Sequence, residues 1–349
     1  MKVLITGGCG FIGQHVAHLL VSQGHDLVAL DLLNPQVHLA PHEAVDRFPG
    51  EVIIADVADP TTWTGIDRVD AVVHLAAETG TAQSMYEEER YRRVNVAGTH
   101  LAGQAALRWG APMVFLSSRA VYGEGRYRSG DGQVHFGSRT ASSDVPEASR
   151  EDDDLVPVSV YGQTKAEAEQ VLAPVRDELP LTILRPQNVV GHGQALHNPY
   201  TGVLAAFLAR LREGKPVQVY GDGHETRDFV HVSDVARSIA WGLGRTTTGE
   251  LVLNAGTGTR TTLNELAEVA IAASPAGGTL EHIAVKRSGD IEHACADLTH
   301  TRQVGAPIAQ VTTAQAITEF ITGSWREPGA DSSTWDNALD ELRERGLAE

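Results

Sequence analysis

The chain has 349 residues, of which 42% are hydrophobic, enough for one large domain or two smaller ones with full cores. Its formal net charge of -17 argues against nucleic acid or an anionic membrane as a partner. No apolar run approaches the ~20 residues of a membrane span, and the N-terminus lacks the pattern of a signal peptide. Cys9 and Cys295 form no CxxC pair, and the 15 histidines have no metal-ligand spacing. We therefore expect a cytoplasmic protein without a metal.

The first stretch predicts a strand, a glycine turn, a helix, a second strand and an acid. Residues 3–5 are apolar, residues 7–13 are rich in glycine, and residues 14–23 have helical periodicity. Such a turn can approach a pyrophosphate closely, and the N–H groups at the helix start favour an anion. Asp31 follows the second apolar run, where its carboxylate can bind both ribose hydroxyls of an adenosine and repel a 2′-phosphate. With strand, helix and acid all present, the pattern favours NAD binding over a generic strand–helix turn. The expected contacts are Gly7, Gly10, Phe11, Ile12, Gly13 and Asp31.

Two further apolar runs predict strands that end in small or acidic residues. Residues 52–55 end at Asp56 and Val57, which either meet an adenine ring or simply close a strand. Residues 70–75 run into small residues that permit close approach of a cofactor. The contacts expected after this strand are Leu75, Ala76 and Ala77.

A long helix through residue 108 and another strand follow. Asn95 lies in the apolar, small-residue start of that helix, where it either braces a neighbouring loop or caps the helix. Residues 112–116 predict the next strand, which ends at Ser117 and Ser118. Residues 124–157 then form a stretch rich in Gly, Ser, Asp and Arg without periodicity. We interpret this insertion as a lid over a substrate rather than a disordered segment.

Tyr161 and Lys165 stand four residues apart on the next predicted helix, so they share one helix face. A tyrosine has an unperturbed pKa near ~10, and a lysine ammonium one turn away stabilises its phenolate. Lowering that pKa by ~3 units corresponds to ~4 kcal/mol of differential stabilisation. Ser118 can hydrogen-bond both a substrate oxygen and Tyr161. Lys165 can also bond the nicotinamide ribose, so Tyr161, Lys165 and Asn95 are expected cofactor contacts as well. A tyrosine four residues before a lysine often occurs by chance. Its place after the glycine turn and Ser118 nevertheless favours catalysis by Ser118, Tyr161 and Lys165.

Together these motifs resemble the extended short-chain dehydrogenases/reductases of the NAD-dependent epimerase/dehydratase family. The resemblance implies an α/β fold, a Rossmann doubly wound parallel sheet with a smaller discontinuous substrate domain, and a homodimer. It also implies that a nucleotide-diphosphate sugar is the ligand and that Pro186 contacts NAD. The matching segments are residues 6–13, 31, 56–57, 74–77, 95, 117–123, 161–165, 184–188, 227–232 and 286–290. The substrate contacts it implies are Ser84, Ser118, Asn188, Arg227, Arg287 and Asp290.

Within the family, the residues after Ser118 favour an epimerase. The 4,6-dehydratases usually carry Asp-Glu there to eliminate a hydroxyl, whereas this chain has Arg119 and Ala120. Residues 31–38 and 187–202 are similar to dTDP-L-rhamnose 4-epimerases, and the catalytic pattern is closer to UDP-galactose 4-epimerase. The resemblance therefore implies 4-epimerisation through a transient 4-keto sugar. A nucleotide-4-keto-sugar reductase and a non-catalytic NAD-binding scaffold are the alternatives.

The second half of the chain is expected to build the substrate domain. We predict a Rossmann domain from residues 1–185 plus 226–255, a substrate domain from 186–225 plus 256–330, and a helical tail at 331–349. Predicted helices cover residues 200–212, 232–243 and 262–273. Ser233 or Asp234 is expected to cap the second of them.

Overall fold

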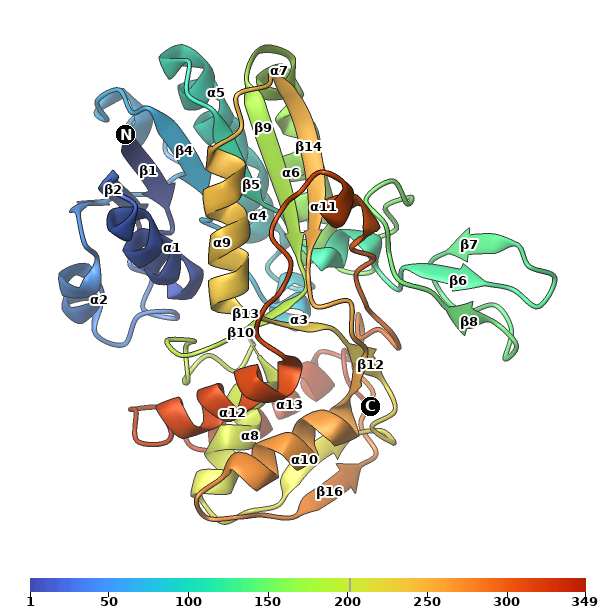
Figure 1. Cartoon of the computed structure of the whole chain (residues 1–349). Coiled ribbons are helices and arrows are strands. Elements are labelled where there is room, and N and C mark those ends of the chain that lie inside the picture. Colours follow the sequence, from blue (N-terminus) through green and yellow to red (C-terminus); the bar gives the residue numbers. More distant parts are fainter. Residues whose placement is uncertain (201) are drawn as a thin grey trace.

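A seven-stranded parallel sheet forms the centre of the larger part of the molecule (Figure 1). The computed structural model describes residues 1–200 and 202–349. The strand order is β14-β9-β5-β4-β1-β2-β3, so the direction of winding reverses between β1 and β4. In open parallel sheets, ligands bind at this switch point, outside the carboxyl ends of the strands. The strands are β1 (Lys2–Thr6), β2 (Asp26–Asp31), β3 (Glu51–Ile54), β4 (Ala71–His74), β5 (Met113–Leu116), β9 (Pro180–Pro186) and β14 (Gly249–Ala255).

Helices cover both faces of the sheet, as predicted for a doubly wound fold. On one face, α1 (Phe11–Ser22) and α9 (Val232–Leu243) share a core with the apolar side chains of β1 and β2. On the other face, α5 (Thr99–Trp109), α6 (Val160–Val171) and α7 (Ala173–Glu178) pack on β4, β5 and β9. The shorter elements of this part are α2 (Pro41–Arg47), α3 (Thr81–Ser84), α4 (Glu88–Tyr91), a π-helix (Arg92–Gly98) and two 3₁₀ turns (Thr62–Thr64 and Arg119–Tyr122).

A second hydrophobic core lies below the carboxyl ends of the strands in Figure 1. It is built by α8 (Val203–Arg212), α10 (Leu263–Ala273) and α12 (Thr313–Ser324), with Phe207 and Phe320 fully buried between them. These helices come from both sides of α9 in the sequence, as a discontinuous unit requires; the exact boundaries stay a prediction. The strand pairs here are β10 (Asn188–Val190) with β13 (Phe229–His231), β11 (Val217–Tyr220) with β16 (Leu280–Ile283), and β12 (Thr226–Arg227) with β15 (Thr261–Thr262).

The last helices close the chain against this lower part. The tail forms α13 (Ser333–Glu344), whose Leu339 and Leu342 pack with Val285 and with the half-buried Tyr86. A shorter helix, α11 (Thr299–Gln303), lies against the end of β14. In the part of the chain that the structure describes, no helix is both long and apolar enough to cross a bilayer.

Two local predictions were wrong. His231, not Ser233 or Asp234, caps α9, and its ring accepts from the Ser233 amide at 3.3 Å. Asp234 lies inside the first turn, and its carboxylate accepts from the amides of residues 310 and 311. The helix predicted from residue 200 begins only at Val203, and Thr201 lies outside the described residues.

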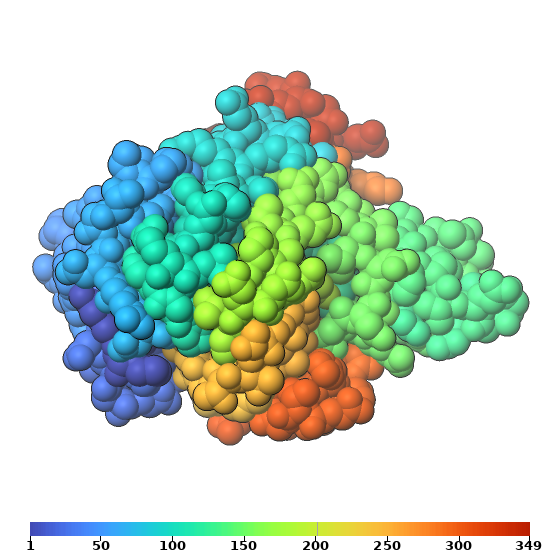
Figure 2. Space-filling view, turned by 90° about the horizontal axis from the view of Figure 1, so that it is seen from above, coloured from blue at the N-terminus to red at the C-terminus, as the bar shows by residue number. Residues whose placement is uncertain are grey.

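The insertion at residues 124–157 is an ordered three-stranded sheet, β7 (Val134–Phe136), β6 (Arg126–Arg128) and β8 (Val145–Pro146). Figure 2 shows it standing out from the side of the molecule, so the sheet is not the lid that we predicted. Its base is joined to the rest of the molecule: the Glu124 carboxylate accepts from the Glu292 amide at 3.0 Å, Ser149 bridges to residues 295–297, and the Glu151 carboxylate accepts from the Asn254 amide of β14 at 2.8 Å. Its charged side chains pair with one another across the strands, which explains why no apolar period marks it.

Candidate active site

The glycine turn packs tightly between the ends of β1 and β4. Gly7 has φ +67°, and a Cβ there would lie 2.9 Å from the Ala76 amide nitrogen. A Cβ on Gly13 would lie 2.3 Å from the Gly7 carbonyl oxygen, so only glycine lets the helix begin this close to the turn. The turn therefore has the shape that a phosphate-binding backbone needs.

The start of α1 is open to an anion. Gly10 contributes no side-chain cap, and the first turn of this helix, from Phe11, carries no acidic residue. The N–H groups of Phe11, Ile12 and Gly13 have no partner within the helix, and the helix dipole adds positive charge there. At the end of β2, the Asp31 carboxylate accepts from the Cys9 amide at 3.0 Å and from the Leu33 amide at 2.9 Å. This fixed carboxylate and the open amides fit the ribose and phosphates of NAD.

The remaining predicted cofactor residues line the neighbouring strand ends. The amides of Leu75 and Ala76 both donate to the Thr6 hydroxyl, at 3.2 and 3.1 Å. Asp56 accepts from the Ala58 amide at 2.8 Å and pairs with Arg93. Val57 packs on the π-helix, Ala77 follows Ala76 in the same turn, and Pro186 ends β9 opposite Ala255.

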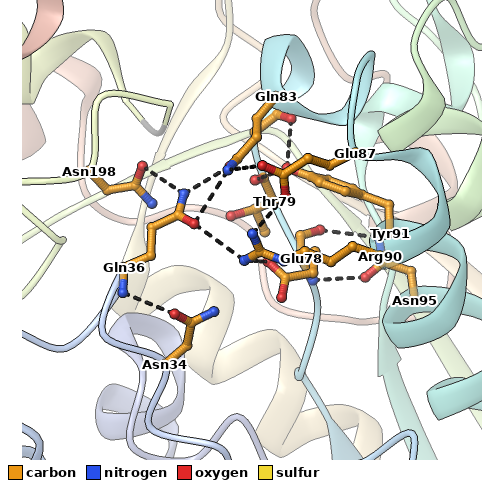
Figure 3. A network of polar contacts seen from close by, with 11 residues as sticks. Asn34, Gln36, Glu78, Thr79, Gln83, Glu87, Arg90, Tyr91, Asn95 and Asn198 are labelled. Atoms are coloured by element: carbon orange, nitrogen blue, oxygen red, sulfur yellow. Dashed lines mark hydrogen bonds and ion pairs between the residues drawn. The ribbon is translucent and has the colours of Figure 1, made fainter. Parts of the chain in front are cut away.

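Asn95 braces a neighbouring loop, which was one of its two predicted structural roles, and its contact with NAD stays a prediction. Its side chain accepts from the Glu78 amide at 2.8 Å and donates to the Glu78 carbonyl at 3.1 Å (Figure 3). It also donates to the Thr164 hydroxyl on α6 at 3.0 Å. The loop after β4 is thereby tied to the helix that carries Tyr161 and Lys165.

The same network joins the loop after β2 to the lower part of the molecule. Gln36 hydrogen-bonds Gln83 at 2.8 Å, Arg90 at 3.2 Å and Asn198 at 3.5 Å, and Figure 3 shows it between them. Arg90 also pairs with the Glu78 carboxylate at 2.6 Å. Three segments far apart in the sequence thus meet beside the switch point.

Ser118, Tyr161 and Lys165 come together at the end of β5. Ser159 caps α6, which places Tyr161 in its first turn and Lys165 one turn later. The Lys165 ammonium is buried, donates to the Leu116 carbonyl at 2.8 Å, and lies 4.9 Å from the Phe115 ring centre. Burial raises the pKa of Tyr161, while the hydrogen bond with Ser118 and the charge of Arg119 lower it. Burial lowers the pKa of Lys165 to about 7.

Two of the predicted substrate contacts, Arg227 and Arg287, form a cationic patch. Arg227 donates to the carbonyls of residues 226, 291 and 292, and burial lowers the pKa of its guanidinium. Arg287 pairs with Asp290 at 2.9 Å and lies over the Tyr220 ring. Asn188 is exposed at the start of β10. Among residues 1–200 and 202–349, no group of three or more His, Cys, Asp or Glu is arranged to hold a metal.

Known proteins share this arrangement over most of the chain. A family model described as the NAD dependent epimerase/dehydratase family matches residues 3–256. The chain belongs to this family. It is 36% identical over 321 residues to the dTDP-L-rhamnose 4-epimerase of Burkholderia thailandensis, covering 86% of this chain and 88% of that protein.

Solved structures of family members have the same fold. The UDP-glucose 4-epimerase of Thermotoga maritima, solved with UDP-glucose, gives a TM-score of 0.79 at 26% identity and covers 92% of this chain and 98% of that one. The UDP-glucose 4-epimerase of Thermus thermophilus, solved with NAD, gives 0.76 at 27% identity, covering 94% and 99%.

One substrate contact implied by the family resemblance is not available. The Ser84 side chain is fully buried, donates to the Thr81 carbonyl at 2.6 Å, and accepts from the Tyr161 amide at 3.0 Å. Its hydroxyl holds the start of α6 and does not face a ligand. The reason is that α3, which carries it, packs directly on α6.

Sequence reasoning also missed a third cation in the site. Arg119, noted only as a departure from the dehydratases of the family, donates to the Gly123 carbonyl. Burial lowers the pKa of its guanidinium to about 10, and the charge of Arg227 contributes to this lowering. Its direct position after Ser118 was the signal that could have placed it here.

The family's glycine turn gives a direct test. Gly13→Ala gains about 1 kcal/mol in helix propensity but forces a methyl group against a backbone carbonyl that cannot withdraw. We expect a net loss of about 1–3 kcal/mol in the free energy of unfolding and loss of bound NAD. Denaturant titration and the NAD content of the purified protein measure both.

Gly65→Ala is the matched control. Gly65 has φ -91°, and its nearest heavy atom to an added Cβ is 3.8 Å away. This variant should keep its NAD and gain up to about 1 kcal/mol. Equal behaviour of the two variants would contradict the close-packing argument.

Proposed function

We propose that this protein is an NAD-dependent 4-epimerase of a nucleotide-activated hexose. The observation that carries the proposal is the convergence of Ser118, Tyr161 and Lys165 on the end of β5, beside a turn shaped for a dinucleotide. The names of the relatives, which are dTDP-L-rhamnose and UDP-glucose 4-epimerases, support the same reaction class. Arg119 and Ala120 support it further, because neither side chain can perform the acid–base steps of a dehydration.

In this proposal, Tyr161 is the acid–base group. Its phenolate takes the proton from the sugar O4, and its phenol later returns that proton to the opposite epimer. NAD would supply a reversible acceptor for the C4 hydride and a positive charge in the site. Ser118 donates a hydrogen bond to the reacting oxygen, and the Lys165 ammonium stabilises the phenolate. Because no net oxidation occurs, one NAD per site serves many turnovers.

The cationic patch would hold the diphosphate. Arg227 and Arg287 offer guanidinium groups that suit phosphate oxygens, and Asn188 offers an amide. Asp290 orients Arg287 through its ion pair and need not touch the ligand. The nucleotide is a dTDP- or UDP-sugar in this proposal, as in the names of the relatives.

The function is tested by isomer formation without added cofactor. Purified protein is incubated with dTDP- and UDP-hexoses, and the products are separated by chromatography with mass detection. We expect the C4 epimer at unchanged mass. Stoichiometric consumption of NADH with a 4-keto sugar would instead indicate a reductase, and no turnover with any sugar would leave only a binding protein.

The chemistry is tested by Tyr161→Phe. This variant loses the acid–base group, so kcat should fall about 10²–10⁴-fold while NAD content stays that of the wild type. Tyr86→Phe is the control, because its hydroxyl bonds Tyr200 away from the strand ends, and it should keep its activity. Unchanged turnover in Tyr161→Phe would remove the proposed mechanism.

We also propose a homodimer that works in a reducing compartment such as the cytoplasm. The half-buried Leu101 and Leu107 on α5, beside α6, supply an apolar surface for the partner copy. Cys9 and Cys295 are both free and buried, which suits reducing conditions. Light scattering in solution should give twice the chain mass, and a monomer at micromolar concentration would contradict the dimer.

A further inference from the structure

A third polar residue continues the catalytic face of α6. Tyr161, Lys165 and Glu169 are spaced at i, i+4 and i+8, so they stand one above another. Each meets the end of β5: Tyr161 meets Ser118, Lys165 donates to the Leu116 carbonyl, and Glu169 accepts from the Ser117 hydroxyl at 2.5 Å. The catalytic face is thus held to three successive residues of one strand end.

Glu169 also makes a buried two-point ion pair with Arg185 of β9. The Arg185 Nε lies 3.0 Å from one carboxylate oxygen and its Nη2 lies 2.7 Å from the other. The two side chains are only 5% and 9% exposed. Arg185 donates further to the Tyr122 hydroxyl at 2.9 Å and to the Glu151 carbonyl at 3.0 Å. The pair is therefore held on both sides by defined partners.

This pair determines the charge balance around Lys165. The Glu169 carboxylate on α6 acts on the Lys165 ammonium, and that ammonium acts on His74 of β4, whereas Arg185 of β9 is joined to it through Glu169. Burial lowers the pKa of His74 to about 3, and the Lys165 charge lowers it too, so His74 is neutral. Burial likewise disfavours the Lys165 ammonium, and the Glu169 carboxylate opposes that effect. Without the carboxylate, two cations would share one buried layer.

We propose that Glu169 and Arg185 are positioning residues, which keep the Lys165 side chain protonated in its buried site and hold the Ser118 strand end against α6. The inference rests on the proposed function, because it assigns Glu169 a role through Lys165. Their polar atoms are engaged by each other and by Ser117, Tyr122 and Glu151. Glu169 supplies the negative charge and the Ser117 contact, while Arg185 orients the carboxylate.

The first experiment compares the pH dependence of kcat/KM in wild type and Glu169→Gln, both loaded with NAD. The amide keeps the shape but removes the charge, so Lys165 loses its proton at lower pH. The alkaline limb of the profile should move down by roughly one pH unit, and activity should recover on acidification. A uniform loss at every pH would mean a purely structural role and would overturn the proposal.

A second readout does not depend on turnover. The ultraviolet absorbance of tyrosinate is followed during a pH titration of wild type and of Glu169→Gln. The titration of the same protein carrying Tyr161→Phe is subtracted from each, which leaves the signal of Tyr161. Loss of the ammonium in Glu169→Gln should move the Tyr161 titration to higher pH, opposite to the shift of the activity limb. No movement of the phenolate signal would also overturn the proposal.

Further variants keep the test decisive. Glu169→Asp retains the charge and should retain the alkaline limb of the wild type, at some loss of rate.

Replacing the whole pair, in Glu169→Gln with Arg185→Met, avoids an unpaired buried cation and covers the case in which the single variant does not fold. The alkaline limb of this double variant should lie at a pH between those of wild type and Glu169→Gln. If the single variant gives no protein, the limb should lie at a lower pH than that of wild type. A limb identical to wild type would overturn the proposal. If wild type itself forms no epimer, the proposed function fails instead, and the two failures are distinguishable.

Discussion

Burial of one ammonium group shapes the centre of this protein. Lys165 projects from α6 to the carboxyl end of β5. Its close partners there are the Leu116 carbonyl, at 2.8 Å, and the ring of Phe115. An isolated charge is costly in such a place, so the same helix supplies the Glu169 carboxylate, which the Arg185 guanidinium of β9 holds through two hydrogen bonds. The helix α6 and the strands β5 and β9 are therefore coupled by polar contacts as well as by packing.

The parallel sheet converts this local arrangement into a site. All strands point the same way, so the residues that follow β1, β2, β4, β5 and β9 emerge at one edge. The glycine turn, Asp31, the loop braced by Asn95, Ser118 and the segment after Pro186 reach the same region for that reason. Gln36 and its partners then link this edge to the second core (Figure 3).

Much of this was predictable from the sequence because the signals are local. The glycine turn, the Asp31 strand end and the Tyr161 and Lys165 spacing each depend on a few consecutive residues. The predictions that failed depend on contacts between distant segments. His231 caps α9 because Asp234 is engaged by residues 310–311, and Ser84 is buried because α3 packs on α6. No local pattern reports either contact. The insertion's strands were missed because they are only two or three residues long and carry charged pairs where longer strands show apolar alternation.

The charge at the site is opposite in sign to the net charge of the chain. A chain with a net charge of -17 should repel a nucleoside diphosphate, yet three guanidinium groups gather on the substrate side: Arg119, Arg227 and Arg287. At physiological ionic strength the Debye length is about 8 Å, so surface carboxylates farther than that contribute little. These three arginines are partly buried, so they are screened less than surface charges and attract a phosphate more strongly than arginines in bulk water would. The local field can therefore favour an anionic ligand although the overall charge of the chain is negative.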